Sequence, residues 1–140
     1  MNENPGRKRR WFWPLLVAAT IFGASSRSHV AAPDITNVDK YGHFLVYGLL
    51  ATLLARVGNG GRAAAAALIA TSIFGLSDEW HQSFVPGRSC DVWDWVADTS
   101  GAALAVTLYA TWPWYRRLLE RELWQRRIEN VAPAATLAGQ

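Results

Sequence analysis

Residues 75–98 hold most of the side chains that could do chemistry in this 140-residue chain. Within them are five carboxylates, one imidazole, one amide and one guanidinium. Carboxylates and imidazoles serve as acid–base catalysts and metal ligands, and the planar guanidinium fork suits phosphate or carboxylate. Uncharged, mostly apolar runs border the stretch at 63–73 and 99–115. This arrangement predicts a polar site at a membrane surface, roofed by one short loop.

A first polar cluster lies earlier in the chain, with Asp39, His43 and Tyr47 at i, i+4 and i+8. If this segment is helical, the three side chains share one face and Lys40 lies near it. Asn37 or Asp39 would cap the helix. The simpler interpretation is a helix start at the membrane interface, with a snorkelling Lys and a hydrogen-bonded His. A site is favoured because polar groups at this depth are costly unless they are used.

A second cluster ends the third apolar run. On a continued helix, Asp78, His81 and Gln82 share a face, while Glu79 lies roughly 100° away. A Pro-Gly pair then predicts a turn that presents Arg88.

A third cluster follows that turn, with Asp91, Asp94 and Asp98 at i, i+3 and i+7. This spacing predicts one acidic stripe on the fourth helix. Asp91 or Ser89 is expected to cap that helix.

Two interpretations of the three clusters remain open. One is a divalent-metal or acid–base site, because carboxylates with imidazole can bind Zn, Mn or Mg. No H-E-x-x-H or other strong metal-binding spacing is present, so the metal is left unknown. The other is a mutually neutralised network, in which Lys40 and Arg88 pair with Asp78, Asp91 or Asp94 and fix the loop.

Four runs without Asp, Glu, Lys or Arg must position these clusters. They are Trp11–Ser26, Tyr41–Ala55, Ala63–Ser77 and Thr99–Tyr115, each about 15–17 residues long. A membrane-spanning helix needs roughly 20 residues, so flanking polar residues must supply the missing turns. The flanking clusters should therefore lie at headgroup depth and face other helices.

The first run follows a basic block at 7–10, which is also the pattern of a signal peptide, with a possible cleavage site near Ala31 and Ala32. We favour an uncleaved transmembrane helix because three further apolar runs follow. Pro14 is then expected in the first turn of that helix, where its missing N–H costs little.

Basic residues are distributed unevenly between the two sides of a four-span protein. One side would hold eleven Lys and Arg residues, and the other would hold Arg27, Lys40 and Arg88. The positive-inside rule places the side with eleven in the cytoplasm, so the polar clusters face outward. The eleven are Arg7, Lys8, Arg9, Arg10, Arg56, Arg62, Arg116, Arg117, Arg121, Arg126 and Arg127, and the outward carboxylates are Asp34, Asp39, Asp78, Glu79, Asp91, Asp94 and Asp98.

We therefore predict an all-α, polytopic membrane protein with four transmembrane helices and both termini in the cytoplasm. Residues 1–10 form a basic N-terminus, residues 11–115 the four-span domain and residues 116–140 a basic amphipathic tail. The tail either lies on the inner leaflet or continues the fourth helix into water. Pro133–Gln140 is expected to be disordered.

Composition agrees with a membrane protein. Hydrophobic residues make up 51% of the chain, and the eight Trp suit membrane interfaces. The net charge of +3 does not indicate nucleic-acid binding, because the basic residues flank apolar runs. Cys90 is the only cysteine, which excludes an internal disulfide.

The polar clusters extend into two longer motifs, Asp39-Lys40-x-x-His43-Phe44-x-x-Tyr47 and Ser77-Asp78-Glu79-x-His81-Gln82-x-Phe84-x-Pro86-x-Arg88-x-x-Asp91-x-x-Asp94-x-x-x-Asp98-x-x-Gly101. Through these motifs the chain resembles the VanZ-like family over roughly residues 10–112. That resemblance implies a small, multi-span bacterial membrane protein, and a founding member of the family is associated with low-level resistance to the glycopeptide teicoplanin.

The resulting functional hypothesis is a multi-pass protein of the inner (cytoplasmic) membrane. Its outward pocket would act on or with an anionic lipid or glycan-lipid headgroup in the cell envelope, with a possible link to glycopeptide tolerance. Whether it is an enzyme stays open, and the alternative is a non-enzymatic subunit whose polar network only stabilises the bundle. Candidate catalytic residues are Asp39, His43, Asp78, Glu79, His81 and Asp91, and candidate substrate-binding residues are Lys40, Tyr47, Gln82, Arg88 and Asp94.

Overall fold

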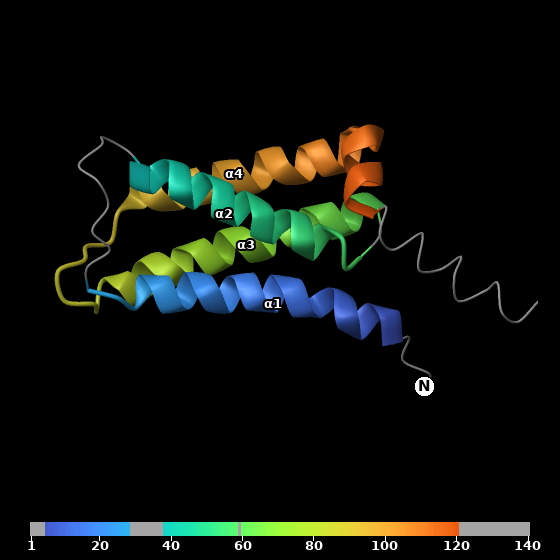
Figure 1. Cartoon of the computed structure of the whole chain (residues 1–140). Helices are drawn as coiled ribbons and strands as arrows, with labels where there is room; N and C mark the ends of the chain where they lie inside the picture. Colours follow the sequence, from blue (N-terminus) through green and yellow to red (C-terminus); the bar gives the residue numbers. More distant parts are fainter. Residues whose placement is uncertain (1–4, 29–37, 59, 121–140) are drawn as a thin grey trace, which may run out of the picture.

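The computed structural model describes residues 5–28, 38–58 and 60–120. Four α-helices lie side by side along one common direction (Figure 1). A short helical segment, 113–120, follows them. The described residues contain no strand, so the all-α class is confirmed. The four are α1 (Pro5–Ser25), α2 (Val38–Ala55), α3 (Gly60–Gln82) and α4 (Val92–Thr111).

The ends of α4 follow from local sequence. Asp91 has an extended backbone, and its carboxylate accepts the N–H of Trp93 at 2.9 Å, so it caps the helix as predicted. At the other end, Trp112 is extended because Pro113 disfavours a helical conformation at the residue before it. The interpretation in which the fourth helix simply runs on is therefore wrong. The rest of the predicted tail, from residue 121, lies outside the described residues.

The start of α1 differs from the sequence prediction. The helix begins at Pro5 and includes the basic block 7–10, so Pro14 lies in its interior and not in its first turn. The prediction was wrong because Arg and Lys are good helix formers and extend the helix upstream of the apolar run. Pro5 occupies the first helical position instead, where a proline costs little.

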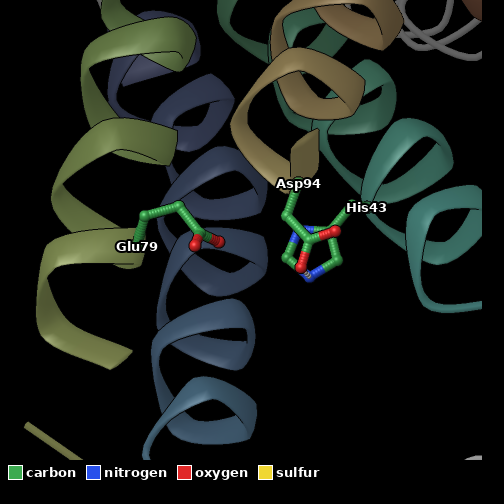
Figure 2. A group of neighbouring side chains, drawn as sticks. All are labelled: His43, Glu79 and Asp94. Atoms are coloured by element: carbon green, nitrogen blue, oxygen red, sulfur yellow. Dashed lines mark ion pairs between the residues drawn. The ribbon is translucent and has the colours of Figure 1, made fainter. Parts of the chain in front are cut away.

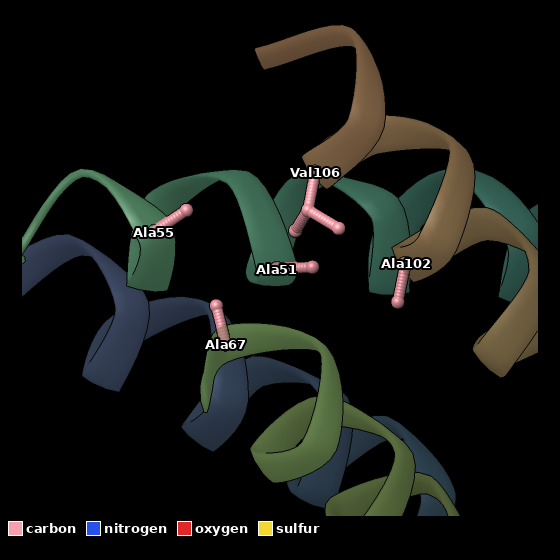
Figure 3. Packing of buried hydrophobic residues seen from close by; sticks show 5 residues of the cluster. All are labelled: Ala51, Ala55, Ala67, Ala102 and Val106. Atoms are coloured by element: carbon pink, nitrogen blue, oxygen red, sulfur yellow. The ribbon is translucent and has the colours of Figure 1, made fainter. Parts of the chain in front are cut away.

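Small side chains allow α2, α3 and α4 to approach closely. A buried cluster of Ala51 and Ala55 from α2, Ala67 from α3, and Ala102 and Val106 from α4 fills the space between them (Figure 3). Such residues favour close helix packing in membranes, where lipid is as apolar as the helices themselves.

The closest approach is that of α2 to α4. A β-carbon added at Gly101 would overlap the backbone of Phe44, and one at Gly48 would lie 3.1 Å from the carbonyl oxygen of Gly101. A second apolar cluster of Ile21, Tyr47 and Leu50 joins α1 to α2.

Polar and apolar side chains are distributed in the reverse of the usual way. The carboxylate residues Asp78, Glu79 and Asp98 are 2%, 1% and 0% exposed. Trp80 and Phe84 are 69% and 70% exposed. Other exposed large apolar side chains are Phe12, Trp13, Leu15, Leu16, Phe22, Leu45, Leu49, Ile69, Ile73, Leu76 and Leu104.

By length and composition alone, one helix of the described residues could cross a membrane, and this is α3. The four-span topology, the cytoplasmic termini and the boundaries of the predicted domains stay predictions.

Candidate functional site at the polar end of the bundle

Three helix ends meet at one end of the bundle, where α2 and α4 begin and α3 ends. We refer to this as the polar end (left in Figure 1). It gathers side chains that are far apart in the sequence into two neighbouring sets of contacts, which we call together the polar cluster. Its members are Lys40, His43, Asp78, Glu79, Gln82, Asp91, Asp94 and Asp98.

Lys40 joins α2 to the start of α4. Its Nζ donates to Asp91 Oδ2 at 2.8 Å and to Asp94 Oδ1 at 2.9 Å, and it lies 3.7 Å from Asp39 Oδ2. The pairing of Lys40 with Asp91, one of the pairs expected from the sequence, is therefore present. The hydrogen bond from Lys40 lowers the pKa of the Asp91 carboxyl below its usual value.

His43 lies one turn further into the bundle. Its Nδ1 is 2.9 Å from Asp98 Oδ1, and its Nε2 is 4.0 Å from Asp94 Oδ2. The ring stacks nearly parallel on the buried ring of Tyr47, with centroids 5.9 Å apart. The Asp98 carboxylate and this stacking together fix the ring, so that Nε2 is directed toward Asp94.

Glu79 reaches the same place from α3. Its Oε2 accepts the backbone N–H of Asp91 at 2.7 Å, which ties the end of α3 to the start of α4. Its Oε1 is buried and has no hydrogen-bond partner among the residues that the structure describes. Ligand atoms of His43, Glu79 and Asp94, one from each of three helices, lie within 4.8 Å of one another (Figure 2).

Asp78 lies on the side of α3 that faces α1. Its Oδ2 accepts from Ser25 Oγ at 2.7 Å and from Gln82 Nε2 at 3.0 Å. Gln82 Oε1 in turn accepts from both Nε and Nη2 of Arg88. Arg88 therefore contacts a neutral amide, and not the carboxylate that was expected from the sequence.

His81 lies apart from the polar cluster. Its ring stacks on Phe22 of α1 with centroids 4.6 Å apart, and its Nε2 is 3.1 Å from Ser26 Oγ. It lines an open groove of about 260 Å³ between α1 and α3. The other lining residues are Phe22, Phe74, Ser77, Asp78, Trp80 and Phe84.

The predicted face of α3 is present in part, because Asp78 bonds Gln82 and lines the same groove as His81. The difference is at Glu79, which was expected about 100° away from that face and is buried as well. The reason is that α3 has neighbours on two sides, with Asp78 bound to α1 and Glu79 bound to the start of α4. A helix packed in this way buries consecutive residues that a one-faced helix would separate.

Three further residues change the candidate set. Asp98 was not among the candidate site residues predicted from the sequence, yet its carboxylate lies within hydrogen-bond distance of His43. Its spacing of four residues from Asp94 on the same helix was the sequence feature that could have identified it. Ser25 was missed as well, because only its place at the end of an apolar run pointed to it. Asp39 is 54% exposed in its side chain and contacts the cluster only through Lys40.

The carboxylates of the cluster can bind a cation or accept a proton. Four carboxylates are buried in it, at Asp78, Glu79, Asp94 and Asp98. Buried carboxylates are costly unless cations or hydrogen-bond donors compensate them. The catalytic and substrate-binding roles predicted from the sequence stay predictions.

Comparison with known proteins gives one match. The sequence model of the VanZ/LLP1 family matches residues 3–113. That range includes all of α1, α2, α3 and α4 and every residue of the polar cluster. No curated protein and no solved structure matches the chain.

Proposed function

The chain belongs to the VanZ/LLP1 family, and from that premise we propose that it is a multi-pass protein of the cytoplasmic membrane. At the polar end, it binds the anionic headgroup of a lipid or of a lipid-linked glycan. The tolerance to glycopeptides that the sequence resemblance implies stays a prediction.

The observation that carries the membrane location is the reversed distribution of polarity. Soluble proteins rarely expose large contiguous apolar surfaces, and they almost never bury several carboxylates. Here Trp80 and Phe84 are exposed, while Glu79 and Asp98 are buried. Lipid around the helices would remove the cost of the exposed apolar side chains, and it would drive ionisable groups to the bundle interior.

The lengths of the helices suit four spans. At 1.5 Å per residue, helices of 18 to 23 residues are about 27–35 Å long, close to the roughly 30 Å of a hydrocarbon core. The charged residues of α2 and α4 that lower their apolar character lie at the polar end, where headgroups would solvate them. We therefore propose four spans, with the polar end at one membrane surface.

Arg88 supports the headgroup proposal. It lies on the turn between α3 and α4, and in the ranges that the structure describes it has no carboxylate within ion-pair distance. Lys40, in contrast, already bonds two carboxylates. The guanidinium of Arg88 is thus the better candidate to meet a phosphate, and the aromatic groove beside Phe84 offers space for an acyl chain.

Lipid titration of the purified full-length chain tests this proposal. Native mass spectrometry in detergent would count bound phosphatidylglycerol, polyprenyl phosphate and phosphatidylcholine at matched concentrations. We expect both anionic lipids to bind about tenfold more tightly than phosphatidylcholine, which corresponds to about 1.4 kcal/mol. A further preference for polyprenyl phosphate over phosphatidylglycerol would identify a polyprenyl-linked phosphate, the carrier part of a lipid-linked glycan, as the source of the headgroup.

Arg88→Gln and Arg88→Lys should each remove most of the preference for anionic lipids, because Lys keeps the charge but lacks the fork. Arg62→Gln, at the opposite end of α3, is the matched control and should retain the preference. Equal binding of all three lipids by the wild type would refute the headgroup proposal. The alternative, a polar network that only stabilises the bundle, would then take its place.

A further inference from the structure

Three residues of the polar cluster that could bind a metal ion converge from different helices. His43 comes from α2, Glu79 from α3 and Asp94 from α4, and their candidate ligand atoms lie within 4.8 Å of one another. Figure 2 shows the carboxylate of Glu79 pointing toward Asp94 and His43. The three helix ends thus place one imidazole and two carboxylates around a common point.

An unpartnered atom points to a missing ligand at this place. Glu79 is 1% exposed, and within residues 5–28, 38–58 and 60–120 its Oε1 has no hydrogen-bond partner, although Oε2 is bound to the backbone of Asp91. A buried carboxylate oxygen without a partner loses its hydration and gains nothing in return. A cation held between Glu79 and Asp94 would compensate that loss.

The orientation of His43 is that of a metal ligand. Metal-bound histidines usually donate their second ring N–H to a carboxylate, which fixes the tautomer and directs the other nitrogen at the metal. Asp98 Oδ1 lies 2.9 Å from Nδ1, so it can accept that N–H and leave the lone pair of Nε2 directed inward. Because Asp98 Oδ1 is engaged with Nδ1, Asp98 acts as a positioning residue for His43.

We propose that His43, Glu79 and Asp94 bind one divalent first-row metal ion, Zn²⁺ or Mn²⁺, whose remaining positions are filled by water. An imidazole with two carboxylates suits these ions better than Mg²⁺, which prefers oxygen ligands and retains most of its water. The 4.0 Å between His43 Nε2 and Asp94 Oδ2 exceeds the roughly 3–3.5 Å between ligands of tetrahedral Zn²⁺. Small side-chain movements would therefore close the site around the ion. This inference does not depend on headgroup binding.

Metal analysis of the untagged, full-length protein tests the site directly. The protein, purified in detergent without added lipid, would be stripped with a chelator, incubated with Zn²⁺ or Mn²⁺, desalted and analysed by inductively coupled plasma mass spectrometry. We expect about one metal ion per chain. The melting temperature should rise by about 5 °C at saturating metal, because an ion that binds only the folded state stabilises it. Mg²⁺ at the same concentration should have little effect.

Matched substitutions assign the ligands. His43→Gln and Glu79→Gln keep the size of each side chain and should each lower the bound metal at least tenfold. His81→Gln makes the same chemical change to a histidine that bonds Ser26 outside the cluster, so it should retain one metal ion. X-ray absorption of the metal-loaded wild type should show a single imidazole in an otherwise oxygen-containing shell. That measurement decides the question even if a variant fails to fold.

Two results would overturn the proposal. One is a wild-type protein that retains less than about a tenth of an equivalent of either metal and shows no rise in melting temperature. The other is equal loss of metal in His43→Gln and His81→Gln, which would indicate non-specific binding. Because the assay contains no lipid, either result leaves the headgroup proposal to its own test.

Discussion

At the residue scale, the ion pair of Lys40 and Asp91 is partly exposed, and the charge state of Asp91 makes it sensitive to pH. Their ion pair is 2.8 Å long, and the Asp91 side chain is 38% exposed. Exposed pairs of this kind contribute roughly 0.2–1 kcal/mol to folding. Asp91 also caps α4, so a test must remove its charge without removing the cap.

Asp91→Asn meets that requirement, since Asn caps helices about as well as Asp. We expect the variant to melt a few degrees below the wild type at pH 7. Because the folded state lowers the pKa of Asp91, this stabilisation is present above the ordinary value of 3.8 and is lost as the pH falls through the lowered value.

Thermal melts of both proteins in detergent between pH 3 and pH 8 provide the measurement. The difference in melting temperature should be constant above about pH 5 and should shrink below about pH 4. Asp39→Asn, which alters a carboxylate 3.7 Å from Lys40, is the control and should differ little from the wild type. A difference that is independent of pH down to pH 3 would show that the loss does not come from the ion pair.

Sequence reasoning at this scale succeeded where spacing along one helix decided the outcome. The cap at Asp91 and the shared face of His43 and Tyr47 follow from helical geometry alone. The partner of Arg88 and the burial of Glu79 did not follow, because they depend on how α3 is rotated about its axis. The apolar residues of α3 are distributed around its whole circumference, so the sequence of this helix does not specify its rotation about the axis.

At the element scale, the contact between α2 and α4 depends on Gly101. A β-carbon there would overlap the carbonyl oxygen of Phe44, which is a backbone atom and cannot move without moving α2. Gly101→Ala should therefore separate the two helices and destabilise the protein by about 1–3 kcal/mol, the usual cost of overpacking. It should also lengthen the contacts of Lys40 with α4.

Gly42→Ala is the matched control for this substitution. Nothing lies within 4 Å of a β-carbon at Gly42, and alanine favours the helix, so this variant should melt at or above the wild-type temperature. Melting curves of the two variants in the same detergent provide the comparison. If Gly101→Ala proves as stable as Gly42→Ala, the helices are not in close contact at that point.

Element boundaries show what a single sequence can specify. The break at Trp112 is a local effect of Pro113 and is readable from the chain. The start of α1 was misplaced because charge was taken as the limit of the helix, whereas Arg and Lys continue a helix without difficulty. Apolar runs therefore indicated where helices lie, but the fourth run was taken to Tyr115, past the end of α4 at Thr111 that Pro113 explains.

At the scale of the whole molecule, the two ends of the bundle carry different charges. The polar end holds the carboxylates of the cluster, while Arg56 lies at the other end of α2 and bonds the backbone of Leu119. Arg10 of α1 donates to the carbonyl of Arg56 at that same end. With the positive-inside rule, this asymmetry predicts that the polar end of the proposed four-span protein faces outward.

The single cysteine of the chain allows that orientation to be tested without disturbing the fold. Cys90 is exposed and lies in the segment between α3 and α4, at the polar end. In spheroplasts, a membrane-impermeant maleimide should label Cys90 before lysis as fully as after it. In a Cys90→Ser background, a cysteine introduced by Arg62→Cys near the start of α3 should be labelled only after lysis.

Labelling of the second protein, and not the first, in intact spheroplasts would invert the orientation and place the polar cluster on the cytoplasmic side. Labelling of both from outside would mean that α3 does not cross the membrane, which would remove the four-span arrangement on which the headgroup proposal rests.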